Sequence, residues 1–405
     1  MQSDKNENSK DIPISQLKSG MYVVSVSRGD KSVNVKTEGY IYSLDKISSL
    51  KKAGIKRVVI DPSKEKVLPT PAASINNTSL KERLATPKKA ISLDQEMAKA
   101  NQLYTNAKGL QQKVLNSIIE GRVIDTTEVK ESTDAIVESI FRNQDALACM
   151  TRLRLKDDYL IEHSLNVSIL MTIFAKHLAI DEAVIEQLAL GAFLHDVGKI
   201  QIRDEVLNKP GKFNPDEYQE MKKHVTFGIK ILEDAPNISH IVMSIVKEHH
   251  ERIDGTGYPF ALAEEAISKY GRMIAIVDSY DAMTAERVYK AGMHPIKAFK
   301  ILVKESLVAY DTELVEQFIQ CLGIYPIGTL VKLTSGKLGL ISRLNKQKPL
   351  QPFVRVFYNT RLNQAIAIEE VDLSKAKYND QIDCCIKPEE FKINLFSFFK
   401  KAFIE

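Results

Sequence analysis

The stretch Leu194-His195-Asp196-Val197-Gly198-Lys199 decides the fold of this chain, because it closes an apolar helical pattern with an imidazole, a carboxylate and an ammonium. Apolar residues before it recur at helical spacing, which predicts a buried helix that ends at His195 and Asp196. Gly198 is expected to end this helix in the left-handed conformation, which glycine adopts without strain. Charge at a buried helix end is costly unless something compensates it. The compensation is either an ordinary ion pair or a divalent metal, for which imidazole and carboxylate are good ligands.

Length, composition and charge restrict the class of protein. The 405 residues are enough for two or three domains, and 44% apolar and 27% charged residues are typical of a globular protein. The net charge of +4 argues neither for nor against nucleic acid, and we expect no nucleic-acid polymer as a partner. The four cysteines match neither a zinc site nor a disulfide framework, and free thiols fit a reducing cytoplasm. The polar N-terminus lacks a signal peptide and no apolar run approaches the ~20 residues of a membrane span, so we expect a cytoplasmic protein.

Shifts in composition and periodicity divide the chain into segments. We expect a disordered start, a small α/β regulatory or interaction domain, a linker rich in Pro, Ser, Thr, Asn and Lys, a helical connector, an all-helical main domain and a β-rich C-terminal appendix with a tail. The fold class is therefore mainly α. In that order, the expected segments are residues 1–11, 12–65, 66–95, 96–139, 140–335 and 336–405.

Two segments outside the main domain leave alternatives open. Apolar residues recur at roughly 3.5-residue spacing in Glu96–Glu120 and Thr127–Ala148, which predicts two helices. These helices form either a hairpin packed on the main domain or a dimerisation element. The aromatic, lysine-containing tail Phe391–Phe403 either docks on the protein's own core or contacts a membrane surface.

The chemistry of the main domain concentrates on histidines and aspartates at helical positions. If these side chains point into one bundle, they form a cluster for more than one metal ion. Two ions ~3.5–4 Å apart activate water and clamp the oxygens of a displacement at phosphorus. The candidate ligands are His163, His195, Asp196, His224, His249, His250 and Asp278. His177, His240 and His294 lack neighbouring ligand types and are expected to be structural or exposed.

Several rare motifs follow one another in the order of a known family. They are Tyr159-x-x-x-His163-Ser164, His195-Asp196-x-Gly198-Lys199, Lys209-Pro210-Gly211, His224, His249-His250-Glu251, Asp254-Gly255-x-Gly257-Tyr258-Pro259, Asp278-x-x-Asp281-Ala282 and Arg287-x-Tyr289. With this set, residues 140–335 resemble the HD-GYP domain, a branch of the HD phosphohydrolase superfamily that hydrolyses cyclic di-GMP. Ile12 to Lys64 resembles, more weakly, the small domain of unknown function that often precedes it.

The resemblance implies an all-helical HD-type bundle and a bacterial second-messenger phosphodiesterase with a cyclic dinucleotide as its substrate. The candidate ligands named above would hold the metal, with Asp196 as the bridging catalytic carboxylate and iron or manganese as the metal, which agrees with the ligand chemistry. Lys199 would neutralise the scissile phosphate. Gly255 and Gly257 would let the backbone turn tightly near the ligand. The implied substrate contacts are Lys199, Gly255, Gly257, Tyr258, Arg287 and Lys290.

The resemblance also bears on partners. The GYP loop (Asp254–Pro259) engages other signalling proteins in some members of the family, so such a partner is compatible with this sequence. A homodimer is compatible with the predicted connector helices. The regulatory signal, the oligomeric state, the identity of the metal and the role of residues 1–65 are left open.

The chain departs from the family pattern at three places. Tyr159 stands where members with a three-metal site carry a glutamate, and tyrosine is a poor ligand at neutral pH, so we expect two divalent metal ions. Arg203 stands where many members have a proline, and residues 261–266 lack the glycines that many members have there. These changes leave the predicted metal centre intact and put the nucleotide preference in doubt.

The leading hypothesis is therefore hydrolysis of cyclic di-GMP to linear pGpG, with GMP as the product of any further cleavage. One alternative is a hydrolase of the mixed cyclic GMP-AMP dinucleotide. Another is a non-catalytic effector that binds the cyclic dinucleotide. A nucleotidase acting on mononucleotides is disfavoured by the paired histidines and the GYP loop. A purely structural role would require the buried ligand-type side chains to satisfy one another without metal, which is costly.

Overall fold

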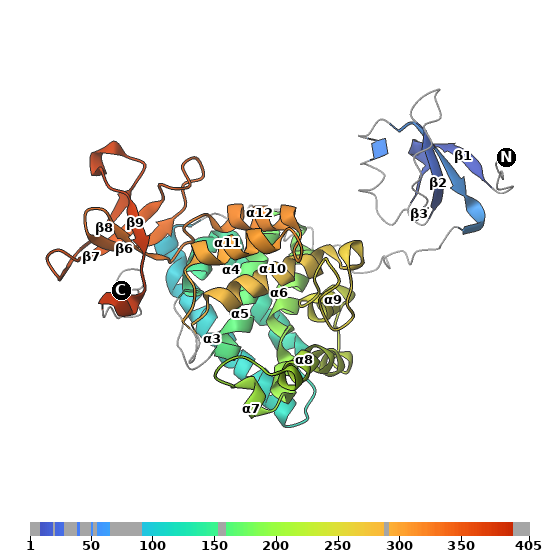
Figure 1. Ribbon diagram of the computed structural model, residues 1–405, viewed down its shortest axis with the longest axis horizontal. Helices are drawn as coiled ribbons and strands as arrows, with labels where there is room; N and C mark the ends of the chain where they lie inside the picture. Colours follow the sequence, from blue (N-terminus) through green and yellow to red (C-terminus); the bar gives the residue numbers. More distant parts are fainter. Residues whose placement is uncertain are drawn as a thin grey trace. The chain divides into compact units, whose positions relative to one another are not determined.

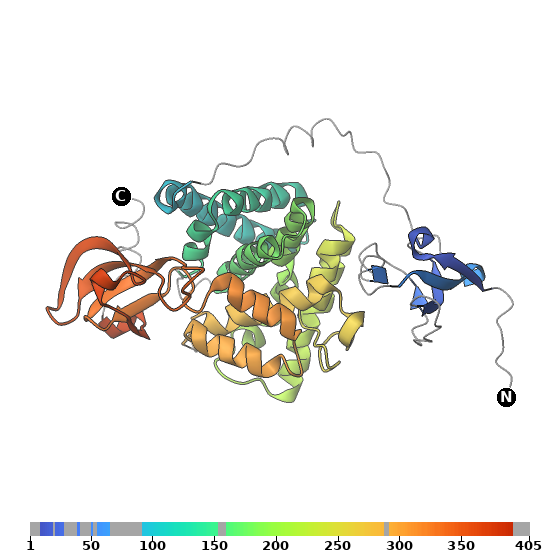
Figure 2. The same cartoon turned by 90° about the horizontal axis from the view of Figure 1, so that it is seen from above.

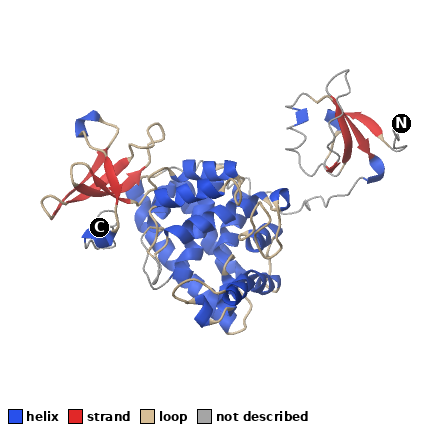
Figure 3. Ribbon diagram, viewed as in Figure 1, coloured by secondary structure: helices blue, strands red, loops and turns tan. Residues whose placement is uncertain are grey.

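The structure is a computed structural model of the 405-residue chain. It describes residues 9–18, 21–27, 39–40, 50–51, 55–64, 91–152, 159–286 and 291–391. The chain divides into two compact units, Met1–Pro87 and Lys88–Glu405. The first unit holds a small sheet, and the second holds a helical core and a five-stranded antiparallel sheet (Figures 1 and 3). The predicted fold class, mainly α with small strand-containing parts at both ends, is confirmed.

The first unit is built on a four-stranded antiparallel sheet with the order β1-β4-β2-β3. The strands are β1 Lys10–Pro13, β2 Tyr22–Ser27, β3 Gly39–Tyr40 and β4 Arg57–Asp61, with 3-10 turns η1 Ile14–Gln16 and η2 Pro62–Lys64. Apolar side chains on one face form its small core, which comprises Ile12, Leu17, Val23, Ile55, Val58 and Ile60. No metal-ligand cluster lies among the residues of this unit that the structure describes.

Ten α-helices of the second unit lie among the described residues. They are α3 Leu93–Ile119, α4 Thr126–Met150, α5 Tyr159–His177, α6 Glu182–Leu194, α7 Asp204–Leu207, α8 Pro215–Glu233, α9 His240–Glu248, α10 Lys269–Thr284, α11 Pro295–Glu305 and α12 Thr312–Leu322. Short 3-10 segments η4 Val197–Gln201 and η5 Glu264–Ala266 join them. None of the helices within the described ranges combines the length and hydropathy that a bilayer crossing requires.

Helices α5 and α6 form the centre of the bundle. Both are apolar over nearly their whole surface, which is typical of a helix with no solvent-facing side. Helix α5 packs against α3, α4, α6, α10 and α12, and α6 also packs against α4 and α9. Side chains at the start of α5 and at the end of α6 therefore lie in the interior of the bundle.

Helices α3 and α4 form a hairpin packed on the bundle, the first of the two predicted alternatives. They lie side by side in Figure 2 and share one apolar core with α5 and α6. The hydroxyl of Tyr104 on α3 donates to Oδ1 of Asn166 on α5, 2.9 Å away. Helix α3 begins at Leu93, inside the predicted linker, because Ser92 and Gln95 form a capping box.

The C-terminal sheet has the strand order β8-β7-β6-β5-β9. Its strands are β5 Leu330–Leu333, β6 Lys337–Arg343, β7 Phe353–Asn359, β8 Gln364–Asp372 and β9 Ile382–Cys385. The 3-10 turn η6 Ala376–Tyr378 lies between β8 and β9, and η7 Pro388–Phe391 follows β9. It is tied to the bundle by Arg355, whose guanidinium lies 2.8 Å from the Asp94 carboxylate at the start of α3. Strand β5 begins inside the range predicted for the helical domain.

Several sequence predictions fall on residues outside the described ranges. These are most of the disordered start, most of the linker and nearly all of the tail Phe391–Phe403. Within the predicted disordered start, Lys10 and Asp11 are instead the first residues of β1, because their backbones pair with β4.

Candidate metal centre

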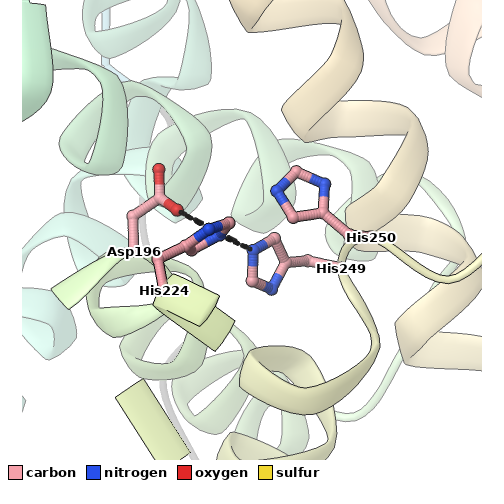
Figure 4. A group of neighbouring side chains, drawn as sticks. All are labelled: Asp196, His224, His249 and His250. Atoms are coloured by element: carbon pink, nitrogen blue, oxygen red, sulfur yellow. Dashed lines mark hydrogen bonds and ion pairs between the residues drawn. The ribbon is translucent and has the colours of Figure 1, made fainter. Parts of the chain in front are cut away.

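The structure brings all seven predicted ligand side chains together in the interior of the bundle. His163 comes from the start of α5, His195 and Asp196 from the end of α6, and Asp278 from the middle of α10. His224 comes from α8, and His249 and His250 directly follow α9. Figure 4 shows His224 between Asp196 and His249, with His250 on the far side of His249. All except His250 are buried.

Asp196 stands between two pairs of histidines. Its Oδ2 lies 3.3 Å from Nε2 of His195 and 3.5 Å from Nε2 of His163. Its Oδ1 lies 3.4 Å from Nε2 of His224 and 3.7 Å from Nε2 of His249. Each carboxylate oxygen therefore faces a different set of nitrogens, which is the arrangement that a bridging ligand needs.

Asp278 also reaches both sides of the cluster. Its Oδ1 lies 3.0 Å from Nε2 of His163 and 3.8 Å from Nε2 of His195. Its Oδ2 lies 3.8 Å from Nδ1 of His250. Two groups of ligand atoms result, both containing Asp196: one with His163 and His195, the other with His224, His249 and His250.

Backbone carbonyls set the orientation of three imidazoles. In each case Nδ1 lies within hydrogen-bond distance of the carbonyl oxygen three residues earlier. The pairs are His195–Ala192 at 2.7 Å, His224–Met221 at 2.6 Å and His249–Val246 at 2.9 Å. A carbonyl can only accept, so Nδ1 carries a proton and donates, and Nε2 points at the centre of the cluster.

His163 is oriented by a carboxylate instead of a carbonyl. Its Nδ1 donates to Oδ2 of Asp281, 2.8 Å away. Asp281 is fully buried on α10, three residues after Asp278. The sequence motif contained Asp281, but no role was predicted for it. The available signal was its spacing, since residues three apart on a helix share a face and Asp278 already faced the cluster.

The chemistry of this cluster fits divalent metal. Nε2 of His195 and Oδ1 of Asp196 are buried and have no hydrogen-bond partner among the described residues, which is costly for polar atoms in a protein interior. Nε2 of His224 and Nε2 of His249 lie 3.2 Å apart, and with both Nδ1 atoms protonated their lone pairs face each other. A cation between these atoms would satisfy all of them.

Burial and charge set the protonation of the ligands. Burial lowers the pKa of His224 to about 4 and that of His249 to about 3, so both are neutral near pH 7, as metal ligands must be. Burial also lowers the pKa of His195, but the Asp196 and Asp278 carboxylates outweigh it and raise that pKa to about 10, so a metal ion that binds there would displace a proton from Nε2. Burial alone would raise the pKa of Asp196, but the positive charges of His195 and Lys199 lower it by more. The pKa of Asp196 therefore lies well below its usual range.

Lys199 and Gly198 lie in η4, directly after the bridging carboxylate. The Lys199 ammonium lies 2.5 Å from Oδ2 of Asp196. The predicted left-handed conformation of Gly198 is wrong, because this glycine lies inside the 3-10 helix with no positive φ. It is needed for close approach instead: a Cβ there would lie 2.0 Å from the carbonyl oxygen of His224 and 2.4 Å from the nitrogen of Gly228.

Comparison with known proteins bears on this site. The sequence model of the HD domain family matches residues 148–314 of this chain. The sequence model of a family described as a domain of unknown function (DUF3391) matches residues 9–129. A cyclic di-GMP phosphodiesterase of Pseudomonas aeruginosa is 34% identical over 377 residues, which cover 92% of this chain and 91% of that protein. The chain belongs to the HD-GYP family.

Two further likenesses are more limited. A 3'3'-cGAMP-specific phosphodiesterase of Vibrio cholerae is 33% identical over 171 residues, 42% of this chain and 37% of that enzyme. The solved structure of an HDG"Y"P protein from Bdellovibrio bacteriovorus covers 76% of this chain and 98% of its own, with 19% identity and a TM-score of 0.49. That structural likeness is too distant to bear on activity.

The loop that gives the HD-GYP family its name lies against the metal centre. The ring of Tyr258 lies 4.6 Å from that of His250, centroid to centroid. Gly255 has φ +76°, which favours glycine. A Cβ on Gly257 would lie 2.4 Å from the nitrogen of Arg252, so this glycine is required by packing against the loop's own chain.

Glu251 holds the far end of the GYP loop, a role that the sequence did not predict. Its carboxylate is buried and accepts from the backbone N–H of Phe260 at 2.8 Å and of Leu262 at 3.0 Å. The third member of the His-His-Glu run therefore shapes the loop, while the two histidines before it face the metal centre.

Other predicted site residues have different outcomes. Arg287, Lys290 and the side chain of Tyr159 lie outside the described residues. His177 and His240 are exposed and His294 is half-buried, and none of the three belongs to either ligand group among the described residues.

Proposed function

We propose that this protein is a metal-dependent phosphodiesterase that hydrolyses cyclic di-GMP to linear pGpG. One observation carries the proposal: the two oxygens of Asp196 face two separate pairs of histidine nitrogens in a buried cluster. The similarity of nearly the whole chain to a cyclic di-GMP phosphodiesterase supports the choice of substrate.

The ligand set supports two divalent ions, iron or manganese. His163, His195 and Asp278 would hold one ion, His224, His249 and His250 the other, and Asp196 would bind both. Imidazole and carboxylate without thiolate suit these metals. When bound, two neighbouring ions supply Lewis acidity to the phosphodiester and lower the pKa of an attacking water.

The protein's own groups contribute position and charge. The carbonyl and carboxylate partners of the Nδ1 atoms hold the histidine rings in place before substrate arrives. Lys199 is 16% exposed and lies at the edge of the cluster, where its ammonium can neutralise charge that builds on the phosphate oxygens. Tyr258 lines the same edge beside His250 and would pack against the nucleotide.

A mixed cyclic GMP-AMP substrate is the second candidate. It is favoured by the 33% identity to a 3'3'-cGAMP-specific enzyme and by the departures at Arg203 and residues 261–266. The Pseudomonas relative matches more than twice as many residues at similar identity, 377 against 171, so cyclic di-GMP remains the leading candidate.

The test is turnover by purified protein reconstituted anaerobically with ferrous iron or manganese. Cyclic di-GMP and cyclic GMP-AMP are offered in parallel, and products are separated by chromatography. We expect pGpG from the wild type and no product from Asp196→Ala, whereas His177→Ala, which removes an exposed histidine outside the site, retains turnover. Folded, metal-loaded protein that cleaves neither dinucleotide would overturn the proposal and favour the effector alternative.

We also propose that the first unit is a regulatory or interaction module. Its separation as a compact unit and the lack of a ligand cluster among its described residues support this role. A truncated chain starting at residue 88 should keep metal binding and differ from the full chain in regulation only.

A further inference from the structure

Two tyrosine rings and one ammonium form a corner beside the metal centre. The rings of Tyr218, on α8, and Tyr258, in the GYP loop, are nearly perpendicular, with 6.5 Å between their centroids. The Lys222 ammonium lies 4.6 Å from the first centroid and 5.3 Å from the second. Tyr218 and Lys222 are four residues apart, so they project from the same face of α8.

Unlike Lys209 and Arg203, Lys222 has no carboxylate partner among the described residues. Lys209 and Arg203 are held by the Glu217 and Glu220 carboxylates of α8. The Lys222 ammonium forms no ion pair with any carboxylate in the described part of the chain and rests on the two rings. It is therefore available to an anion from outside the protein.

The corner lies on the accessible side of the metal centre. Tyr258 contacts His250, which is 18% exposed, whereas the other imidazoles of the cluster are at most 1% exposed. Tyr218 is 45% exposed. A ligand in contact with His250 would therefore lie beside Tyr258, which in turn contacts Tyr218 and Lys222.

We propose that Tyr218 and Lys222 form a binding subsite for the half of the cyclic dinucleotide that is not being cleaved. Lys222 pairs with the second phosphate, and Tyr218 stacks on the base of the same nucleotide. An aromatic surface next to an unpaired cation matches a nucleotide, because bases stack on aromatic rings and phosphates pair with ammonium groups. This inference rests on the proposed cyclic dinucleotide substrate.

The test measures binding separately from turnover. Calorimetry gives the Kd of the metal-loaded full chain for a phosphorothioate analogue of cyclic di-GMP that resists hydrolysis. We expect about tenfold weaker binding by Lys222→Met, which keeps an unbranched apolar side chain on the rings, and a smaller dependence of Kd on salt. Tyr218→Ser should also weaken binding, and Tyr218→Phe should restore it, because stacking needs only the ring. Metal content and melting temperature report whether each variant is folded and loaded.

A matched control lies next to the proposed subsite. Lys223 is exposed and carries the same charge, and among the described residues the cation contacts of the two rings come from Lys222, so Lys223→Met should leave Kd, its salt dependence and turnover as in the wild type. Equal Kd values for Lys222→Met and Lys223→Met would overturn the inference. A wild type that binds the analogue but does not cleave cyclic di-GMP would refute the proposed hydrolysis alone, and loss of binding in Lys222→Met would still support the subsite.

Discussion

Asp281 accepts a hydrogen bond from Nδ1 of His163 at 2.8 Å, on the side of the imidazole that faces away from Asp196. The two residues are 118 positions apart in the chain and both are buried. Asp281 thus fixes which nitrogen of His163 carries the proton and which faces the cluster. It is a positioning residue that acts through its neighbour.

Asp281→Asn should weaken metal binding about 10–100-fold, because the amide lacks the charge that makes the imidazole a better ligand. The affinity is measured by competition with a chelator, followed by metal analysis. Asp204→Asn, which changes an exposed carboxylate on the short helix α7, is the control and should bind as the wild type does. A wild-type affinity in Asp281→Asn would show that the carboxylate does not influence the metal.

Gly198→Ala should lower the free energy of unfolding by about 1–3 kcal/mol, the usual cost of inserting a methyl group into closely packed structure. The new Cβ would meet the backbone of His224 and Gly228, so α8 must move and carry His224 with it. We also expect reduced metal content. Both are measured on purified protein, by urea unfolding and by metal analysis.

Gly109→Ala is the matched control for that variant. Gly109 is exposed within α3, and a Cβ there would meet nothing within 4 Å. The substitution should stabilise the protein by about 0.5–1 kcal/mol, because alanine favours a helix interior over glycine. If both variants unfolded at the same urea concentration, the close approach at Gly198 would not govern stability.

Glu251→Gln should loosen the GYP loop. Its amide offers only one acceptor oxygen to the two N–H groups of Phe260 and Leu262, leaving one donor unsatisfied at a cost of about 1–3 kcal/mol. Hydrogen exchange should become faster over residues 254–262. Glu264→Gln, an exposed change at the start of η5 after this loop, should exchange as the wild type does. Unchanged protection in Glu251→Gln would mean that other contacts hold the loop.

Metal-stripped protein should lose stability as the pH falls from 6.5 toward 4. Burial lowers the pKa of His224 to about 4 and of His249 to about 3, below the ordinary value of 6.5. Between these values the unfolded chain binds protons that the folded chain does not, so the stability present above pH 6.5 is lost on acidification. Urea unfolding at pH 7 and pH 5 in the presence of a chelator measures the loss.

Removing one of these imidazoles tests the cause of that loss. His224→Asn should show a smaller difference between pH 7 and pH 5, and His177→Gln, at an exposed position, should show the wild-type difference. The pKa shift of His195 has the opposite effect on the pH dependence of stability. Its raised pKa, about 10, contributes stability below pH 6.5 that is lost as the pH rises toward 10. An equal pH dependence of stability in the wild type, His224→Asn and His177→Gln would contradict the assignment of the loss to buried histidines.

The sequence by itself determined the ligand types and the elements that carry them. The apolar pattern before His195 predicted a buried helix, and α6 ends at Leu194 with His195 as its cap. Spacing along one helix is a local property, so periodicity can reveal it. The order of the motifs was also enough to identify the family, because it does not depend on how the helices pack.

Only the tertiary structure decided how these side chains meet. Three features join residues from different helices and loops. They are the division of the Asp196 oxygens between two histidine pairs, the contact of His163 with Asp281, and the corner of Tyr218, Tyr258 and Lys222. Gly198 illustrates what the sequence could not predict. The sequence suggested a left-handed helix end, whereas this glycine is needed because the backbone of α8 lies where a side chain would be. Such contacts depend on the packing of distant segments, and no local pattern encodes that packing.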